Sequence, residues 1–104
     1  MSTLSLRELN TPLLALRLLS VEHTELPAPS LSVSTIYPDR LDLSFHDDLS
    51  GFEAWREVLG VEPCNVEYGE QGDGQTRVLT AHADYAGAHI RLTGFGQITT
   101  GEAA

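Results

Sequence analysis

The sequence predicts a single α+β domain in which an antiparallel sheet of about five strands carries two helices on one face, in the order α-β-β-α-β-β-β. Two segments, 12–23 and 50–59, place apolar residues at helical spacing. Most of the remaining chain alternates apolar and polar residues, which is the period of half-buried strands. With 104 residues, 41% of them hydrophobic, the chain has room for one core. We therefore expect one domain over residues 1–104, with frayed ends at 1–10 and 99–104.

The first helix is expected after a short polar segment in which Ser5 and Glu8 have the spacing of a capping box. Thr11 is predicted as its N-cap and Pro12 as its first residue, because a proline there loses no helical hydrogen bond. The leucines that follow form a stripe wider than one buried face needs: Leu13, Leu14, Leu16, Leu18 and Leu19. This stripe is either enclosed in the core or shared between the core and an oligomer contact.

Two alternating segments on either side of the sequence Pro-Asp-Arg predict a β-hairpin. Residues that oppose each other in an antiparallel pair share a face, so Val33 should lie opposite Leu43 or Phe45. This matching requires an odd-numbered connection. We therefore predict a turn of three or five residues centred on Asp39.

The second helix is the most completely specified element. Ser50 and Glu53 have the spacing of a capping box, and Asp47 and Asp48 place acids at the positive end of the helix dipole. Gly60 is expected to end the helix in the left-handed conformation.

One face of this helix carries Phe52, Trp55 and Leu59, which are expected to be buried. The charged residues of the opposite face are expected to point to solvent: Glu53, Arg56 and Glu57. Trp55 is interpreted as a core residue. If it were exposed beside another aromatic residue, a protein-binding patch would be the better interpretation.

Three more strands are expected at about 64–68, 75–83 and 88–95, joined by a glycine-rich turn at 69–74 and a second turn at 84–87. The last strand contains Gly-Phe-Gly. That sequence is either the end of the strand or a bulge that lets the backbone approach a ligand.

The charge balance limits the kinds of partner that the protein is expected to bind. Fifteen acids face six bases, all of them arginine, so the formal net charge is -9. Such a surface repels a phosphate backbone, so we expect no direct nucleic-acid binding; cationic partners, basic protein surfaces or solubility alone remain. No segment has the length of a membrane span or the pattern of a signal peptide, so we expect no membrane association and a cytoplasmic location.

The reactive residue types form no recognisable motif. Cys64 is the single cysteine and has acidic neighbours rather than the bases that activate a thiol, so it is predicted to be buried. The four histidines lack metal-binding spacing, and we predict no catalytic residue, no metal and no cofactor. One alternative stays open. His46 and His89 fall on the polar faces of their strands beside Asp42 and Arg91, where a His–Asp cluster could form.

Residues 26–95 begin LPAPSLSVSTIYPDRLDLSFHDDLSGFEAWREVLG and continue into a glycine-rich hairpin. This stretch, about two-thirds of the chain, resembles small proteins of Streptomyces-type actinobacteria and of their mobile elements. The absence of lysine beside abundant Ala, Gly, Leu and Arg agrees with such a high-GC origin. The resemblance implies no activity, cofactor or site residue.

These observations favour a non-enzymatic protein-binding or accessory module that binds a protein partner or a second copy of itself. An alternative is an acidic regulator that occupies the basic nucleic-acid-binding surface of a partner. That alternative needs one continuous carboxylate patch, and Trp55 joins its members as a candidate binding residue: Asp42, Asp47, Asp48, Glu53 and Glu57. A further alternative is a small enzyme that uses His46 or His89 with a carboxylate.

Overall fold

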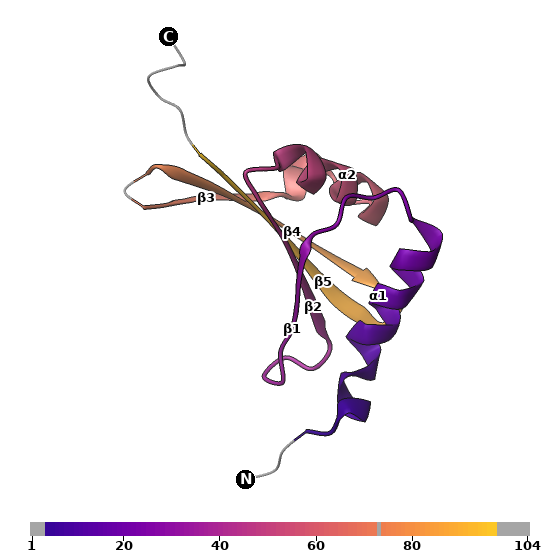
Figure 1. Cartoon of the computed structure of the whole chain (residues 1–104). Helices are drawn as coiled ribbons and strands as arrows, with labels where there is room; N and C mark the ends of the chain where they lie inside the picture. Colours follow the sequence, from indigo (N-terminus) through magenta and orange to yellow (C-terminus); the bar gives the residue numbers. More distant parts are fainter. Residues whose placement is uncertain (1–3, 73, 98–104) are drawn as a thin grey trace.

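In the computed structural model, which describes residues 4–72 and 74–97, one five-stranded sheet carries both helices on the same face (Figure 1). The elements in chain order are a 3-10 turn Leu6–Leu9, α1 Asn10–Glu22, β1 Ser30–Val33, β2 Arg40–His46, α2 Leu49–Leu59, a 3-10 turn Pro63–Asn65, β3 Glu67–Gln71, β4 Thr76–Tyr85 and β5 Ala88–Gln97. The predicted α+β class and the predicted order of helices and strands are confirmed.

Of the expected frayed end 1–10, residues 6–10 are helical, and residues 1–3 lie outside the described residues. The Ser5 N–H donates to the Glu8 carboxylate at 2.7 Å, and the Glu8 N–H donates to the Ser5 carbonyl at 3.0 Å. The predicted pairing of these two residues therefore starts a 3-10 turn that runs directly into α1. The other end expected to fray, 99–104, lies outside the described residues.

α1 begins two residues before its predicted start, and Pro12 is its third residue, where a backbone N–H would also lack a helical acceptor. The fully buried residues of the helix are Pro12, Ala15 and Leu19. Leu13 and Leu14 remain 37% and 46% exposed. The leucine stripe is therefore only partly used by the core.

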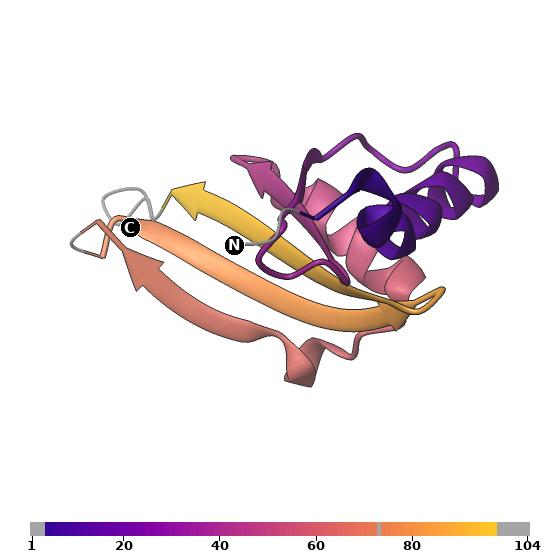
Figure 2. The ribbon, with the colours of Figure 1, turned by 90° about the horizontal axis from the view of Figure 1, so that it is seen from below.

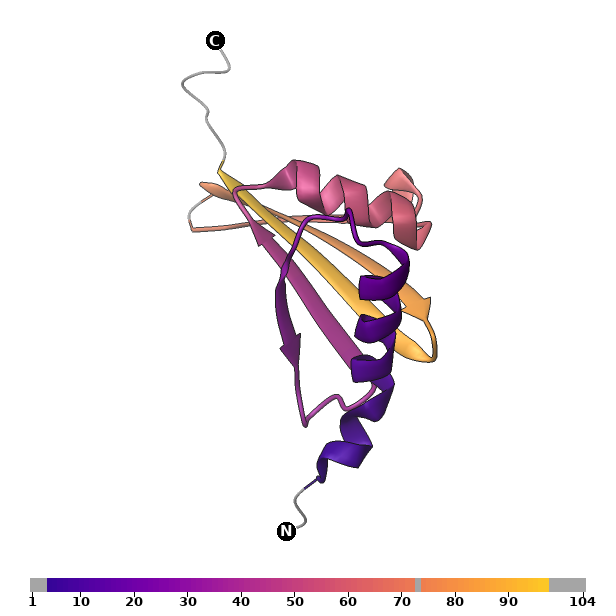
Figure 3. The same cartoon turned by 45° about the vertical axis from the view of Figure 1, so that its right-hand side comes forward.

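The sheet is mixed, which corrects the expected antiparallel arrangement. Its strand order is β1-β2-β5-β4-β3, and β2 and β5 run parallel from the pair Arg40↔His89 to the pair His46↔Phe95. α2 carries the chain across the sheet from the end of β2, and the β3-β4-β5 meander then returns with β5 beside β2 (Figure 3). β2 and β5 take the centre because each alternates buried residues beneath the helices, whereas β1 and β3 are exposed and form the edges.

The β1–β2 pairing places Val33 opposite Leu41 and Leu31 opposite Leu43. The predicted parity is confirmed, because apolar residues face apolar residues and an odd-numbered segment, 34–40, separates Val33 from Leu41. The predicted partner of Val33 and the predicted turn length are wrong. The chain leaves the sheet after Val33 instead of pairing up to the proline.

The core lies between the two helices and the three central strands. Its buried apolar residues are Ala15, Leu19, Leu41, Leu43, Phe45, Phe52, Trp55, Val61, Ala81, Ala88, Ile90 and Leu92. Gly94 and Gly96 near the end of β5 let α2 approach the sheet. A Cβ on Gly94 would lie 3.0 Å from Phe52 Cδ2, and one on Gly96 would lie 3.0 Å from Leu49 Cδ1. The Gly-Phe-Gly sequence thus belongs to the end of β5, and its glycines face the helix.

The C-terminal end of α2 is built as predicted, but its N-cap is a different residue. Asp48 Oδ1 accepts the Gly51 N–H at 3.0 Å, so Asp48 is the cap, and the Ser50 hydroxyl donates to the same carboxylate at 2.7 Å. The predicted role of Ser50 is therefore wrong, because the aspartate two residues earlier reaches the free amide of the first turn. Gly60 ends the helix with φ 76°, as predicted.

Arg56 is buried, which corrects its expected position on the solvent face of α2. Its side chain is only 10% exposed, and its Nη1 donates to the Val61 carbonyl at 2.6 Å. Its Nε and Nη2 donate to the two carboxylate oxygens of Glu53 at 3.0 and 2.9 Å. The planar guanidinium can thus bind the backbone just after the helix, at Val61, while it stays paired with Glu53. The burial expected for Phe52 and Trp55 is confirmed.

Candidate functional site

The face of the sheet opposite the two helices is open (Figure 2). It carries the outward-pointing residues of the central strands: Arg40, Asp42, Ser44, His46, His82, Asp84, His89, Arg91 and Thr93. Three of the four histidines and two of the six arginines lie on this face. The open face therefore gathers imidazole and guanidinium groups together with the carboxylates of Asp42, Asp84 and Glu67.

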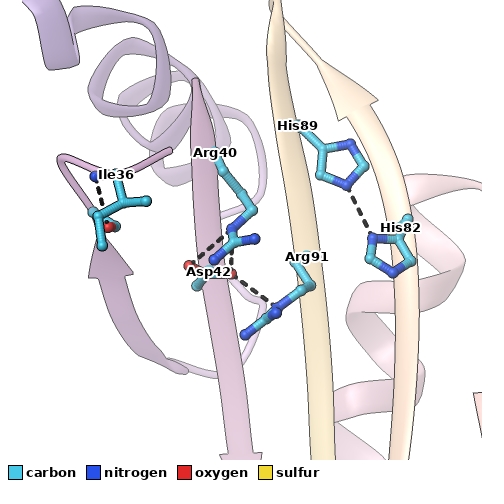
Figure 4. Close-up of polar contacts among 7 residues, drawn as sticks. Ile36, Arg40, Asp42, His82, His89 and Arg91 are labelled. Carbon is cyan, nitrogen blue, oxygen red and sulfur yellow. Dashed lines mark hydrogen bonds and ion pairs between the residues drawn. The ribbon is translucent and has the colours of Figure 1, made fainter. Parts of the chain in front are cut away.

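Asp42 lies between two arginines on the open face (Figure 4). Its Oδ1 is 3.1 Å from Arg40 Nε and 3.1 Å from Arg91 Nε, although neither contact is aligned as a hydrogen bond. Arg40 Nε also donates to Oδ2 at 3.2 Å. Because two guanidinium groups share one carboxylate, this cluster carries a net positive charge. Asp42 is thus engaged by arginines of its own chain.

His82 and His89 meet on the open face, and each also faces a carboxylate. His82 Nδ1 lies 2.9 Å from His89 Nε2. The ring centroids are 5.1 Å apart with an interplanar angle of 27°, so the rings meet edge to edge (Figure 4). The outer nitrogens face acids: His89 Nδ1 is 3.4 Å from Asp84 Oδ1, and His82 Nε2 is 4.0 Å from Glu67 Oε1. A chain of acid, histidine, histidine and acid crosses three strands.

His89 was predicted on the polar face of its strand, but its contact with His82 was not predicted. The pairing depends on the β4–β5 hairpin, whose two turn residues Ala86 and Gly87 have φ 51° and 84°. In this register His82 lies opposite Arg91, which makes His89 its diagonal neighbour on the same face. A two-residue turn centred on Ala-Gly was the available signal, and a four-residue turn was predicted instead.

The five acids of the predicted patch do not form one surface. Asp42 lies on the open face, whereas Glu53 and Glu57 belong to α2, which covers the opposite face. Asp48 caps α2, and hydrogen bonds from the Ser50 hydroxyl and then from the Gly51 N–H lower its pKa. Asp42 and Asp48 therefore each bind neighbouring groups of their own chain, which is a structural role.

Trp55 is a core residue. Its side chain is 5% exposed, and its Nε1–H donates to the Pro27 carbonyl at 2.8 Å. An apolar hollow of about 200 Å³ lies beside it, with Leu26 and Leu31 in its lining. The indole thus joins α2 to the connector between α1 and β1 by a hydrogen bond, and it does not form an exposed aromatic patch.

His46 lies apart from the histidine pair. Its ring stacks on Phe95 with centroids 4.7 Å apart and an interplanar angle of 8°. It lines an open hollow of about 490 Å³ together with Asp47, Gln71 and Thr76. This hollow contains one histidine and one carboxylate, and His46 also lines a second open hollow of about 340 Å³ together with Asp42 and Arg91.

Cys64 is exposed, which corrects its predicted burial, because the 3-10 turn Pro63–Asn65 carries it along the surface between α2 and β3. Within residues 4–72 and 74–97, no three metal-binding side chains converge on one point. In the same part of the chain, each helix falls short of the length and apolar character needed to cross a bilayer.

A second candidate site is the free edge of the sheet at β1, which we call the β1 edge and define as Ser30–Val33. Leu31 within it is 49% exposed, and Ile36 and Tyr37 in the following loop are 77% and 53% exposed. No charged residue occurs in residues 26–38. An uncharged strand edge with exposed apolar side chains is suited to pairing with another strand.

Comparisons of the chain with protein-family models, with curated proteins and with solved structures give no match. Two features of the described residues bear on function, the β1 edge and the histidine pair on the open face.

Proposed function

We propose that this chain is a non-enzymatic protein-binding module whose β1 edge pairs with the β1 edge of a second copy, joining two sheets into one. The proposal is carried by one observation, an edge strand that pairs with β2 on one side, has no partner on its outer side among the described strands, and has uncharged exposed side chains. Strand addition at such an edge supplies backbone hydrogen bonds, and the neighbouring apolar side chains supply buried area.

The β1 sequence is complementary to itself. If an antiparallel pair is centred on Ser32, Leu31 lies opposite the partner's Val33 and Ser30 lies opposite the partner's Ser34. Apolar residues then meet on the helix-covered face and serines meet on the open face, which is the matching that a twofold interface requires.

The opposite edge of the sheet is unsuited to the same contact. β3 carries Glu67 and Glu70, and all five of its residues are exposed. Acids on an edge strand repel a like strand and oppose edge-to-edge pairing. Association through β1 is therefore favoured over association through β3.

Two copies each carry a formal charge of -9, so long-range repulsion opposes the dimer. The Debye length falls from about 30 Å at 0.01 M salt to about 8 Å at 0.15 M, so added salt screens this repulsion. A four-residue edge is also small, typical of transient contacts that bury less than about 1,200 Å². We expect a weak dimer that tightens as the salt concentration rises.

The experiment is sedimentation velocity of the full chain at concentrations up to about 1 mM, at low and at physiological salt. We expect the weight-average mass to rise with both concentration and salt. A monomer under every condition would overturn the proposal.

Two matched variants locate the contact. Leu31→Lys and Tyr68→Lys each replace an exposed apolar side chain of an edge strand with a cation, and each changes the net charge by the same amount. Leu31→Lys should abolish association and Tyr68→Lys should leave it at or above the wild-type level. Loss in both variants, or in Tyr68→Lys alone, would contradict pairing at the β1 edge. Thermal unfolding of both variants checks that they fold.

A further inference from the structure

We propose that His82 and His89 form a cross-strand chelate for a divalent transition-metal ion, with Cu²⁺ the preferred ion. The proposal is separate from the dimer, because it uses side chains of β4 and β5 on the open face and not the β1 edge. Two imidazole nitrogens 2.9 Å apart, each carried by a ring whose other nitrogen faces a carboxylate, are the observation that carries it.

The inner nitrogens share a hydrogen bond, and an ion can replace it after the two rings turn slightly. Metal–imidazole bonds are about 2.0–2.1 Å long, so two nitrogens 2.9 Å apart subtend an angle of about 90° at a shared ion. A right angle is the angle between neighbouring ligands in square-planar and octahedral sites, whereas a tetrahedral ion needs nitrogens about 3.3 Å apart. Exposed rings that can turn reach both separations, so the choice of ion follows the affinity series, in which Cu²⁺ binds nitrogen ligands more tightly than Ni²⁺ or Zn²⁺.

The outer nitrogens are placed to orient the rings. Asp84 faces His89 Nδ1 at 3.4 Å and Glu67 faces His82 Nε2 at 4.0 Å. When both outer nitrogens carry the proton that a carboxylate accepts, both inner nitrogens of the neutral rings are left with free lone pairs. The proton that the inner nitrogens share in the metal-free hydrogen bond then lies on an outer nitrogen, and the ion takes its place. A carboxylate behind each metal-bound histidine is the common arrangement in protein metal sites.

The surroundings leave room for the ion, although Arg40 lies opposite His89 and shares Asp42 with Arg91. The side chains of His82 and His89 are 40% and 43% exposed, so both rings can turn until their lone pairs converge on one point. Arg91, which lies opposite His82 in the sheet, directs its charge to Asp42. The remaining coordination positions face solvent and are available to water.

The experiment titrates Cu²⁺ alone into the full ¹⁵N-labelled chain. We expect visible d–d absorption that saturates at one ion per chain, with paramagnetic broadening that begins at the amides of β4 and β5 around the histidine pair. His82→Gln and His89→Gln should each weaken Cu²⁺ binding about tenfold or more and abolish this broadening, because each leaves a single imidazole.

His46→Gln is the matched control, because it removes a histidine from the same face and should leave both the affinity and the broadening pattern unchanged. Asp84→Asn should weaken binding by about tenfold, as removal of an orienting carboxylate does. Broadening centred on His23, on His46 or on the N-terminal amine would overturn the proposal, and so would affinity that survives both His82→Gln and His89→Gln. Thermal unfolding confirms that each variant folds.

Discussion

Gly94 is the position where the close approach of α2 to the sheet can be tested most directly. A Cβ at this position would lie 3.0 Å from Phe52 Cδ2 and 3.1 Å from Leu49 Cδ2, closer than ordinary van der Waals contact. Both neighbours are packed between the helix and β5, so the added methyl group overfills the interface. Overpacking of this kind costs about 1–3 kcal/mol.

The same substitution also gains backbone stability. Alanine in a strand interior is favoured over glycine by about 0.5–1 kcal/mol, which offsets part of the overpacking. We therefore expect Gly94→Ala to lower the free energy of unfolding by about 1–2 kcal/mol. In a domain of this size the melting temperature should fall by about 4–8 °C for each kcal/mol.

Gly69→Ala is the control. Gly69 also lies within a strand, but a Cβ there would meet nothing within 4 Å. Only the backbone effect remains, so this variant should be slightly more stable than the wild type. Urea unfolding followed by tryptophan fluorescence measures both variants. A change of the same sign in Gly94→Ala and Gly69→Ala would refute the reasoning that α2 packs against the glycine face of β5.

Three further substitutions test α2 and its contacts. Trp55→Phe removes the indole N–H that donates to Pro27 and should lower the free energy of unfolding by about 1–2 kcal/mol in urea titrations. The lowered pKa of Asp48 stabilises the fold above the pKa of an unfolded aspartate, about 3.9, and this contribution is lost as the pH falls through the folded pKa. Asp48→Asn should therefore show a shallower decline of stability below about pH 4 in acid titrations than the wild type. Arg56→Lys cannot reproduce the fork that joins Val61 and the neighbouring acid, so its melting temperature should fall below that of a surface control, Arg17→Lys.

The elements whose stability is decided locally were predictable from the sequence. α2 has acids at its start, an apolar stripe and a glycine at its end within the fourteen residues 47–60, and these signals agree with the structure. The alternation of β5 likewise shows which of its residues are buried. The position of the cap was not predictable in the same way. Asp48 and Ser50 both have the side chain for it, and only the geometry of the first turn decides between them.

The order of the strands was not predictable from local signals. A meander is the simplest reading of three strands in succession, and it leaves open which of them lies beside β2. Burial across the whole sheet decides which strand lies beside β2. β5 must lie beneath the helices, because its Ala88, Ile90 and Leu92 are fully buried. The parallel β2–β5 pairing then follows from the direction in which α2 carries the chain.

The histidine pair was missed for a related reason. His82 and His89 are seven residues apart, which matches no metal-binding motif in a helix or within one strand. They meet only because a two-residue turn fixes the register of the β4–β5 hairpin, and Ala86 must adopt a positive φ to make that turn. Longer turns would place the two rings on different diagonals or on opposite faces.

The two proposed sites are separated by the order of the strands. β1 forms one edge of the sheet, and β2 lies between it and β5, which carries His89. Strand pairing at the edge uses backbone groups in the plane of the sheet, whereas the chelate uses side chains that project from its open face. A Leu31→Lys variant should therefore remain monomeric and still bind Cu²⁺ as the wild type does. If this variant lost both properties while its melting temperature stayed unchanged, the β1 edge and the histidine pair would have to belong to one site, and the separation inferred from the strand order would be wrong.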